Sequence, residues 1–443
     1  MLNKFYLITC ISLICLIGSS CRFQTIETVP LESAVKKVTP VYNKYRDCFF
    51  KIFMDEDKNR FNGFTAEWVV GEREKFEKEP FNLLYDEAKF GDGNVYCGLT
   101  LTFLSFDYGI QISNQNKKEA SRTLKMIERV INGIIKSDQL SLQGSNGFLY
   151  RDIVGEVKGI KVRSDFLNKK ITDKYMSQSQ IVGLLIGYST FNKVIKDLNL
   201  NSQKINELKK KLDQQIKLIA QYLKRNHFVI KSEVNNKIKV PRGPYAKIIS
   251  KKVFQLYNFY SGDENKFPFG IKEKLYWSIG SRGYNSFYNL TNDKRSYYEK
   301  NLTKGIQTSG KTWGPFFHQL LCQYPFTDKR TFQKTEPQWK KWVERYRNSL
   351  AVAMALANFS VVDEQLKQMV YDDLMAIPTY RTPDNFHADH KGWVHENRWI
   401  RLLSLNTHVG KSERIVRVYN GLDFLMLYGA TKYSQIIYRK SNE

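Results

Sequence analysis

Apolar side chains along this chain follow two alternating patterns, and both are typical of helices. In the first, apolar residues fall on nearly every side of the segment, as in Val95–Phe106, which predicts a helix buried all round. In the second, apolar residues recur at steps of three and four with polar and charged residues between them, as in Lys117–Ser137 and Asn201–Leu223. The alternation predicts a double layer, in which buried helices pack against half-exposed ones.

Segments that are apolar on nearly every side occur several times along the chain, and most of them begin at a glycine. The first copy follows the turn Gly91–Asn94, where glycine permits positive φ and Asp92 or Asn94 can cap a helix. The later copies are Gly183–Tyr188, Gly314–Leu321, Leu350–Phe359 and Gly421–Tyr428. The same patterns predict helices over Tyr42–Phe53, Met176–Ile195, Asp363–Met375 and Val418–Tyr433, and an irregular stretch over Asp55–Pro80.

Glycine-led buried helices alternating with amphipathic ones resemble the α/α-toroid, or six-hairpin, proteins, which include glycoside hydrolases and helical domains of polysaccharide lyases. Local stretches that add to the resemblance are Gly91–Gly93, Ser177–Leu185 and Asn420–Tyr428. The resemblance implies an all-α fold, a single α/α toroid of about six helical hairpins over residues 40–443, with function decided by the site rather than the fold. Inner helices would point the same way, so their N-terminal ends and loops would share one rim.

The N-terminus has the order of a signal peptide. Lys4 supplies the positive charge, Leu7–Ile17 is a short apolar run, and small residues precede Cys21. The ending resembles a bacterial lipobox, although Gly18 replaces the usual leucine. We therefore predict a signal peptide over 1–20, lipidation of Cys21 and a tether over 21–39; a plain secretory signal is the alternative. Either way the chain is exported, and the lipid anchor would hold it in the cell envelope, at the outer membrane or cell surface.

The charge balance favours an anionic neighbour. The 443 residues include 69 Lys and Arg against 44 Asp and Glu, a formal net charge of +25. Such a surface suits membrane headgroups, an acidic glycan or nucleic acid, and export excludes nucleic acid as a partner. A solvated basic surface without a ligand is the alternative. After the predicted cleavage and lipidation, Cys48, Cys97 and Cys322 remain. They allow one disulfide but are too few and too widely spaced for a disulfide framework.

Glycoside cleavage needs two carboxyl groups on either side of the scissile bond. Asp92, at the mouth of the first buried helix, is the best single candidate for one of them. Its partner could be Asp152, Asp384, Asp389 or Glu396, and the sequence does not choose among them. The alternative for Asp92 is a turn or helix-cap aspartate.

The densest chemical cluster is residues 386–399, which hold three of the six histidines and two tryptophans. His395 and Glu396 could form an acid–base pair, while Trp393 could stack on a sugar and Arg398 could hold its hydroxyl groups or carboxylate. The three histidines could instead bind zinc, although their spacing is not the helical metalloprotease pattern. A loop packed by its aromatic residues is the fourth interpretation.

Two arginines and one glutamine complete the predicted site. Arg151 and Arg242 follow or occupy glycine-bearing loops and could pair with a carboxylated or sulfated ligand, and Gln180 lies at the mouth of a buried helix. The alternative for each arginine is a solvated surface position. No nucleotide-binding glycine loop or serine-nucleophile elbow is present.

Together these features predict an exported lipoprotein that processes a glycan, preferably an anionic one, as a hydrolase or lyase without a cofactor. The first alternative is a non-catalytic envelope lipoprotein that binds a glycan or a protein partner. The second is a metal-dependent enzyme that uses the histidine cluster at 387–395.

Overall fold

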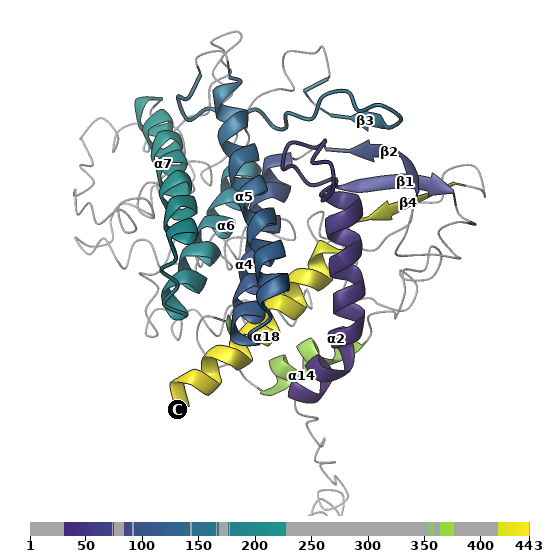
Figure 1. Cartoon of the computed structure of the whole chain (residues 1–443), viewed down its shortest axis with the longest axis vertical. Helices are drawn as coiled ribbons and strands as arrows, with labels where there is room; N and C mark the ends of the chain where they lie inside the picture. The colour runs from purple at the N-terminus through teal and green to yellow at the C-terminus, as the bar shows by residue number, and fades with distance from the viewer. Residues whose placement is uncertain are drawn as a thin grey trace, which may run out of the picture.

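The computed structural model describes residues 31–72, 74, 84–90, 93–141, 144–164, 166–167, 176, 178–226, 353, 356–357, 364–375 and 415–442. Helices make up 68% of this part, and a small sheet lies to one side of them (Figure 1). The fold is therefore mostly α, as the hydrophobic patterns predict.

Three helices form an inner layer: α4 (Gly93–Ser113), α6 (Gln178–Asp197) and α18 (Leu422–Asn442). Each covers a segment that the sequence predicts as a buried helix. α4 has its largest contacts with α6, followed by α5 and α18. Its side chains are buried from its first residue almost to its last, which confirms that a helix apolar on all sides lies between other elements.

The three inner helices run in the same direction. Near the start of α4, Gly98 lies against Gly183 of α6. Farther along α4, Phe106 lies against Gly429 of α18, and Gly109 lies against Val194 of α6 and Tyr433 of α18. Because residue numbers rise together along all three helices, their N-terminal ends point to the same end of the molecule.

Outer helices cover this layer: α2 (Leu31–Cys48), α5 (Lys117–Gln139) and α7 (Gln203–Arg225), with α14 (Glu364–Met375) against α2. α2 continues as the short π-helix η1 (Phe49–Phe53). The outer helices bury one face, as their three- and four-residue periodicity predicts. On α7 the buried positions include Ile205, Leu208, Leu212, Ile216 and Ile219.

The sheet was not predicted. It contains β1 (Trp68–Glu72), β2 (Tyr85–Lys89), β3 (Lys161–Arg163) and β4 (Ile415–Tyr419), in the order β3-β2-β1-β4. β1 lies in the stretch predicted as irregular, and β4 includes the first residues of the predicted closing helix. These strands are short and pair with distant segments, so local periodicity gives little sign of them. The expectation of an all-α fold was wrong in this respect.

α2 begins earlier than predicted. Its first residue is Leu31, so the last part of the predicted tether, up to Thr39, is helical. Ala34, Val35 and Val38 supply a buried stripe there, and Pro40 lies on the exposed side. The helix was missed because proline usually interrupts a helix interior.

Segments from the two ends of the described chain pack together. The ring of Tyr42 on α2 stacks on that of Tyr428 on α18, with centroids 4.0 Å apart, and Tyr45 meets Phe424 edge-on at 5.0 Å. β1 also pairs with β4 over its full length. Among the described residues, no helix combines the length and the apolar character needed to cross a membrane.

Candidate functional site

The polar side chains at the N-terminal ends of the inner helices form the candidate site. We call this region the rim and define it as Gly93–Cys97, Tyr150–Val154, Gln178–Gln180 and Asn420–Leu422. The segment from Tyr150 to Val154 lies directly on the start of α4. The Asn94 amide donates to the Arg151 carbonyl over 2.9 Å, and a Cβ at Gly93 would lie 2.7 Å from the same carbonyl oxygen. Glycine at position 93 is therefore what lets this loop and the helix start approach so closely.

Asp152 is buried, with 1% of its surface exposed. Its carboxylate accepts a hydrogen bond from the Val154 amide over 3.1 Å, which folds the loop back on itself. Burial, and then the negative charge of Asp152, raise the pKa of the Cys97 thiol well above its ordinary value. Cys97 therefore stays protonated at neutral pH, which excludes it as a thiolate nucleophile.

The buried position of Asn94 at the rim was not predicted from the sequence, which indicated only that Asn94 could cap α4. The structure places it inside the first turn of α4, fully buried. Its Nδ2 donates to the Tyr150 carbonyl, and its Oδ1 is buried without a hydrogen-bond partner among the described residues. A buried acceptor left without a donor costs about 1–3 kcal/mol, so few such groups persist in native proteins.

α18 begins with a more ordinary cap. Asn420 Oδ1 accepts from the Leu422 amide over 3.1 Å, and its Nδ2 donates to the Ala66 carbonyl over 3.1 Å. Gly421, at a φ of 69°, supplies the left-handed backbone between them. This cap therefore attaches the start of α18 to the segment that leads into β1.

The structure brings two of the predicted site residues to the rim. Arg151 is half-buried and lies over the start of α4, while Gln180 is fully buried in the first turn of α6. The other predicted site residues lie outside the described residues: Cys21, Asp92, Arg242, Trp393, His395, Glu396 and Arg398. The chain neighbour of Asp92, Gly93, is the first residue of α4.

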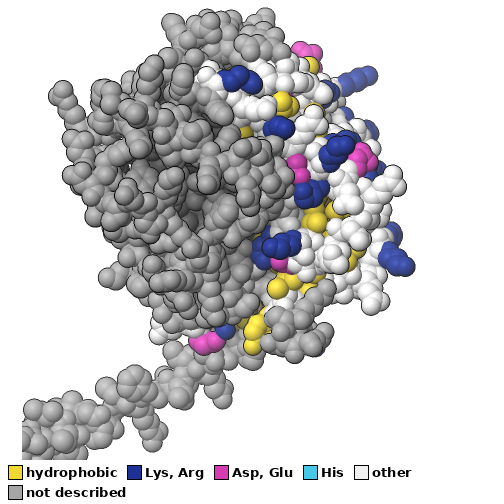
Figure 2. All heavy atoms as spheres, turned by 90° about the vertical axis from the view of Figure 1, so that its left-hand side faces the viewer, with side chains coloured by type: hydrophobic (Ala, Val, Ile, Leu, Met, Phe, Trp, Pro, Cys, Tyr) yellow, Lys and Arg dark blue, Asp and Glu magenta, His cyan; other side chains and the backbone are white. Residues whose placement is uncertain are grey.

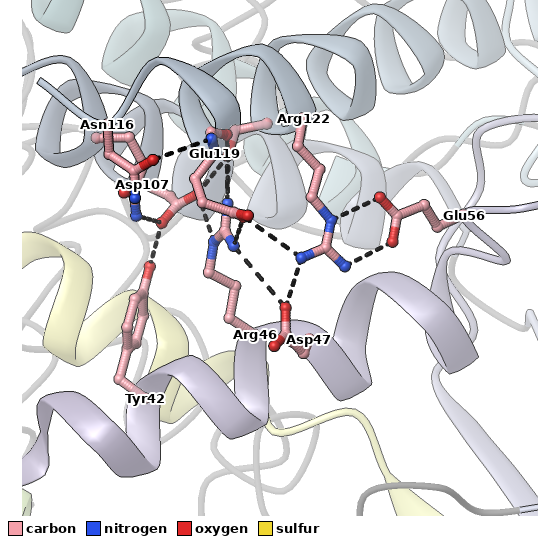
Figure 3. A network of polar contacts seen from close by, with 10 residues as sticks. Tyr42, Arg46, Asp47, Glu56, Asp107, Asn116, Glu119 and Arg122 are labelled. Atoms are coloured by element: carbon pink, nitrogen blue, oxygen red, sulfur yellow. Dashed lines mark hydrogen bonds and ion pairs between the residues drawn. The ribbon is translucent and has the colours of Figure 1, made fainter.

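A second polar cluster lies near the other end of α4 (Figure 3). Asp107, fully buried on α4, accepts hydrogen bonds from Tyr42 over 2.7 Å, Arg46 Nε over 2.8 Å and Thr123 over 2.5 Å. Gln111 donates to the same carboxylate over 3.0 Å. Four donors from α2, α4 and α5 thus surround one buried carboxylate.

The cluster continues to the outer surface of α5. Arg122 donates to both carboxylate oxygens of Glu56 over 2.6 Å and to Asp47 over 2.5 Å, and Arg46 contacts Glu119 over 2.5 Å. Burial by itself would raise the pKa of Glu56, but the hydrogen bonds and charge of Arg122 outweigh it and hold that pKa below its ordinary value. Because each carboxylate already pairs with an arginine, this network is a structural clamp and not a reactive site.

No group of three or more His, Cys, Asp or Glu side chains among the described residues could hold a metal ion. Comparison with known families, characterised proteins and solved structures gives no match to this chain.

Proposed function

We propose that the protein is an exported, lipid-anchored protein of the cell envelope that processes a glycan, preferably an anionic one, at the rim. The observation that carries the proposal is the parallel arrangement of α4, α6 and α18. The N-terminal ends of α4 and α6 lie together at one end of the molecule, where Arg151 is half-buried over the buried Asn94, and α18 points toward the same end. Aligned helix N-termini favour a negatively charged ligand.

The toroid belongs to the same proposal. In a closed ring of hairpins, the last inner helix would pack beside the first. α18 packs against α4 and α2, and Tyr42 of α2 donates to Asp107 of α4, an arrangement that supports a ring of this kind. The alternation of inner helices α4 and α6 with outer helices α5 and α7 gives two hairpins of the expected kind. Completion of the ring to about six hairpins is the part of this proposal that rests on the sequence resemblance.

The proposed chemistry uses carboxyl groups at the rim. A hydrolase needs one protonated and one ionised carboxyl across the scissile bond. Asp152 is a weak candidate, because it is buried and already accepts a hydrogen bond from its own loop. Asp92, which precedes α4 directly in the sequence, is the stronger one, with His395 and Glu396 as its proposed partners.

In this proposal Arg151 contacts the ligand and Gln180 positions the start of α6. Arg151 is half-buried, and its guanidinium suits a carboxylate or sulfate. Gln180 has no exposed surface, so a supporting role fits it better than direct contact. Arg242, Trp393 and Arg398 remain proposed binding residues.

Turnover of acidic oligosaccharides by the chain from residue 22 onward tests the catalytic proposal. Asp92→Asn should abolish turnover while leaving binding in place, since it removes a proton-transferring group but keeps the shape. Asp86→Asn, at an exposed position on β2, is the matched control and should leave turnover unchanged. Unchanged turnover in Asp92→Asn would remove Asp92 from the mechanism.

The lipid anchor has a separate test. Cells that express the full chain should incorporate labelled fatty acid into it, and Cys21→Ala should abolish the label. Label that persists in this variant would contradict lipidation at Cys21.

The non-catalytic binder remains the alternative, and the excess of 69 basic over 44 acidic residues is the observation that favours it. Binding of an acidic glycan or an envelope protein without any turnover would support that alternative. The metal-dependent alternative rests on the histidines of 387–395, which lie outside the described residues.

A further inference from the structure

α2 presents a row of lysines on its exposed face. Lys36, Lys37, Lys44 and Lys51 are all exposed, the last of them in η1. We call these four the α2 lysine face. Lys37, Lys44 and Lys51 are seven residues apart, which is two helical turns, so they line one side of the helix. The opposite side is held in the core by large residues such as Tyr42 and Tyr45.

The lysines of this face have no hydrogen bond or ion pair with any described residue. The nearby acid Asp47 is already paired with Arg122 over 2.5 Å. Glu32 is also exposed, one helical turn before Lys36, so this face keeps a net excess of positive charge. The mutual repulsion of its lysines would be relieved by an anionic surface.

Three lysines of α7 differ from the α2 lysine face, because Lys204, Lys209 and Lys211 each pair with an acidic side chain. Figure 2 views the molecule from the left-hand side of Figure 1, and it shows acidic side chains beside several of the basic ones. Lys209 pairs with Asp213 on α7 over 2.6 Å, and Lys204 pairs with Glu128 of α5 over 2.5 Å. Charges already paired within the protein gain less from an external anion, so the unpaired α2 lysine face is the better candidate for one.

The position of α2 close to Cys21 in the sequence indicates which anion the α2 lysine face meets. α2 begins at Leu31, ten residues after Cys21, the proposed lipid-bearing residue. Even a fully extended segment of that length spans only about 35 Å. An acyl chain on Cys21 would therefore keep the start of α2 near the membrane surface, where the cationic face meets lipid headgroups.

We propose that the α2 lysine face binds the anionic phospholipid headgroups of the membrane that holds the protein and orients the domain on it. This inference rests on the export and anchoring in the proposed function. Lysines near an anionic leaflet each strengthen binding roughly fivefold. The four together contribute roughly a six-hundredfold effect, which salt weakens by screening.

The test uses vesicle sedimentation with the chain from residue 22 onward, which keeps every described element. One set of vesicles is pure phosphatidylcholine, and in the other set part of it is replaced by phosphatidylglycerol. We expect binding to the anionic vesicles alone, and its loss in the variant with Lys36, Lys37, Lys44 and Lys51 all changed to Gln. Gln has nearly the helix propensity of Lys, so α2 should remain folded, and circular dichroism melting checks this.

The control variant changes Lys125, Lys158, Lys196 and Lys210 to Gln. These lysines are also exposed and have no ion pair with a described residue, so the net charge changes equally. The control should keep most of the anionic-vesicle binding. Equal loss in both variants, or equal binding to neutral vesicles, would overturn the proposal. Loss of heparin binding in the α2 variant with vesicle binding unchanged would also overturn it and assign the face to a glycan.

This test is independent of lipidation, because the truncated chain lacks Cys21. Failure to bind vesicles would therefore leave the lipid anchor and the glycan site standing. Conversely, absence of the fatty-acid label from the full chain would contradict the lipid anchor without changing any vesicle affinity measured with the truncated chain.

Discussion

The two sides of α4 are stabilised in different ways. Toward α6, backbone meets backbone: Gly98 lies so close to Gly183 that a Cβ would be 2.0 Å from its carbonyl carbon, and Gly187 lies against the Gly98 carbonyl. Toward α2 and α5, the contact centres on the buried Asp107–Arg46 ion pair, whose side chains are 0% and 4% exposed. One side therefore depends on the absence of side chains, and the other on a set of directed hydrogen bonds.

The contrast shows how one helix is fixed both in distance and in register. Close backbone packing gains many small dispersion contacts and fixes the distance between α4 and α6. The Asp107 cluster is directional, because a shift of α2 along α4 would separate donors from the carboxylate. A buried ion pair is weak evidence for stability by itself, but its loss on one side is costly. The following experiments alter each side in turn.

The largest effect is expected at the charged side. Asp107→Ala leaves the guanidinium of Arg46 buried beside Tyr42 and Thr123 without its main carboxylate. Removing one partner of such a buried pair costs about 3–5 kcal/mol. Chemical denaturation should show this loss in the free energy of unfolding.

Replacement of both partners separates lost charge from lost shape. Arg46→Met combined with Asp107→Leu removes the two charges and keeps most of the volume, so the double variant should be more stable than Asp107→Ala alone. A double variant at least as unstable as the single one would contradict the view that the uncompensated charge causes the loss.

The next largest effect is expected at the glycine side. Gly98→Ala places a Cβ against the Gly183 backbone, which has no flexible end to move aside, and should cost about 3 kcal/mol. Gly109→Ala is the matched control on the same helix. Its Cβ would meet only side-chain atoms of Tyr433, Val194 and Leu198 at 3.0–3.2 Å, and alanine gains about 1 kcal/mol of helix propensity over glycine.

We therefore expect Gly109→Ala to change stability by less than about 1 kcal/mol. Similar unfolding free energies for the two alanine variants would show that the α4–α6 contact tolerates separation. The close approach would then not be a determinant of the fold.

A smaller effect concerns pH. Burial alone would raise the pKa of Glu56 and Glu119, but their arginine partners outweigh it and lower both pKa values below the ordinary 4.5. Folded pKa values below the unfolded ones mean that this stability is present above about pH 4.5 and is lost as pH falls through the folded values.

Arg122→Met removes the partner of Glu56 and Asp47. At neutral pH this variant should be about 1 kcal/mol less stable than the parent chain, a modest cost because the pair is partly exposed. The difference should shrink as the pH falls below about 4, since protonated carboxyls no longer need the arginine. Urea unfolding at several pH values measures it, and a difference that stays constant with pH would contradict the assignment.

Much of the helical fold could be predicted from local periodicity. The segments Val95–Phe106, Lys117–Ser137 and Asn201–Leu223 lie within or largely match α4, α5 and α7, because their apolar spacing directly states which face is buried. Strands β1 and β4 could not be predicted, since each is short and finds its partner at the opposite end of the chain.

The candidate site was less predictable. Arg151 was singled out for its loop, and the structure places it at the rim. The role of Asn94 was not predicted, because its side chain bonds to the loop at Tyr150, which lies far from it in sequence. The Asp107–Arg46 pair was also missed. An aspartate inside an apolar helix gives no sign of its partner until the helices pack.

The functional proposal depends above all on binding of an anionic glycan at the rim. Thermal shift of the chain from residue 22 onward, with panels of neutral and acidic oligosaccharides, tests it most directly, because a ligand that binds only the folded state raises Tm. We predict a rise with acidic oligosaccharides that Arg151→Ala reduces at least tenfold in apparent affinity, while the control Lys158→Ala retains it. No rise with any oligosaccharide, or an equal rise in Arg151→Ala, would contradict the claim.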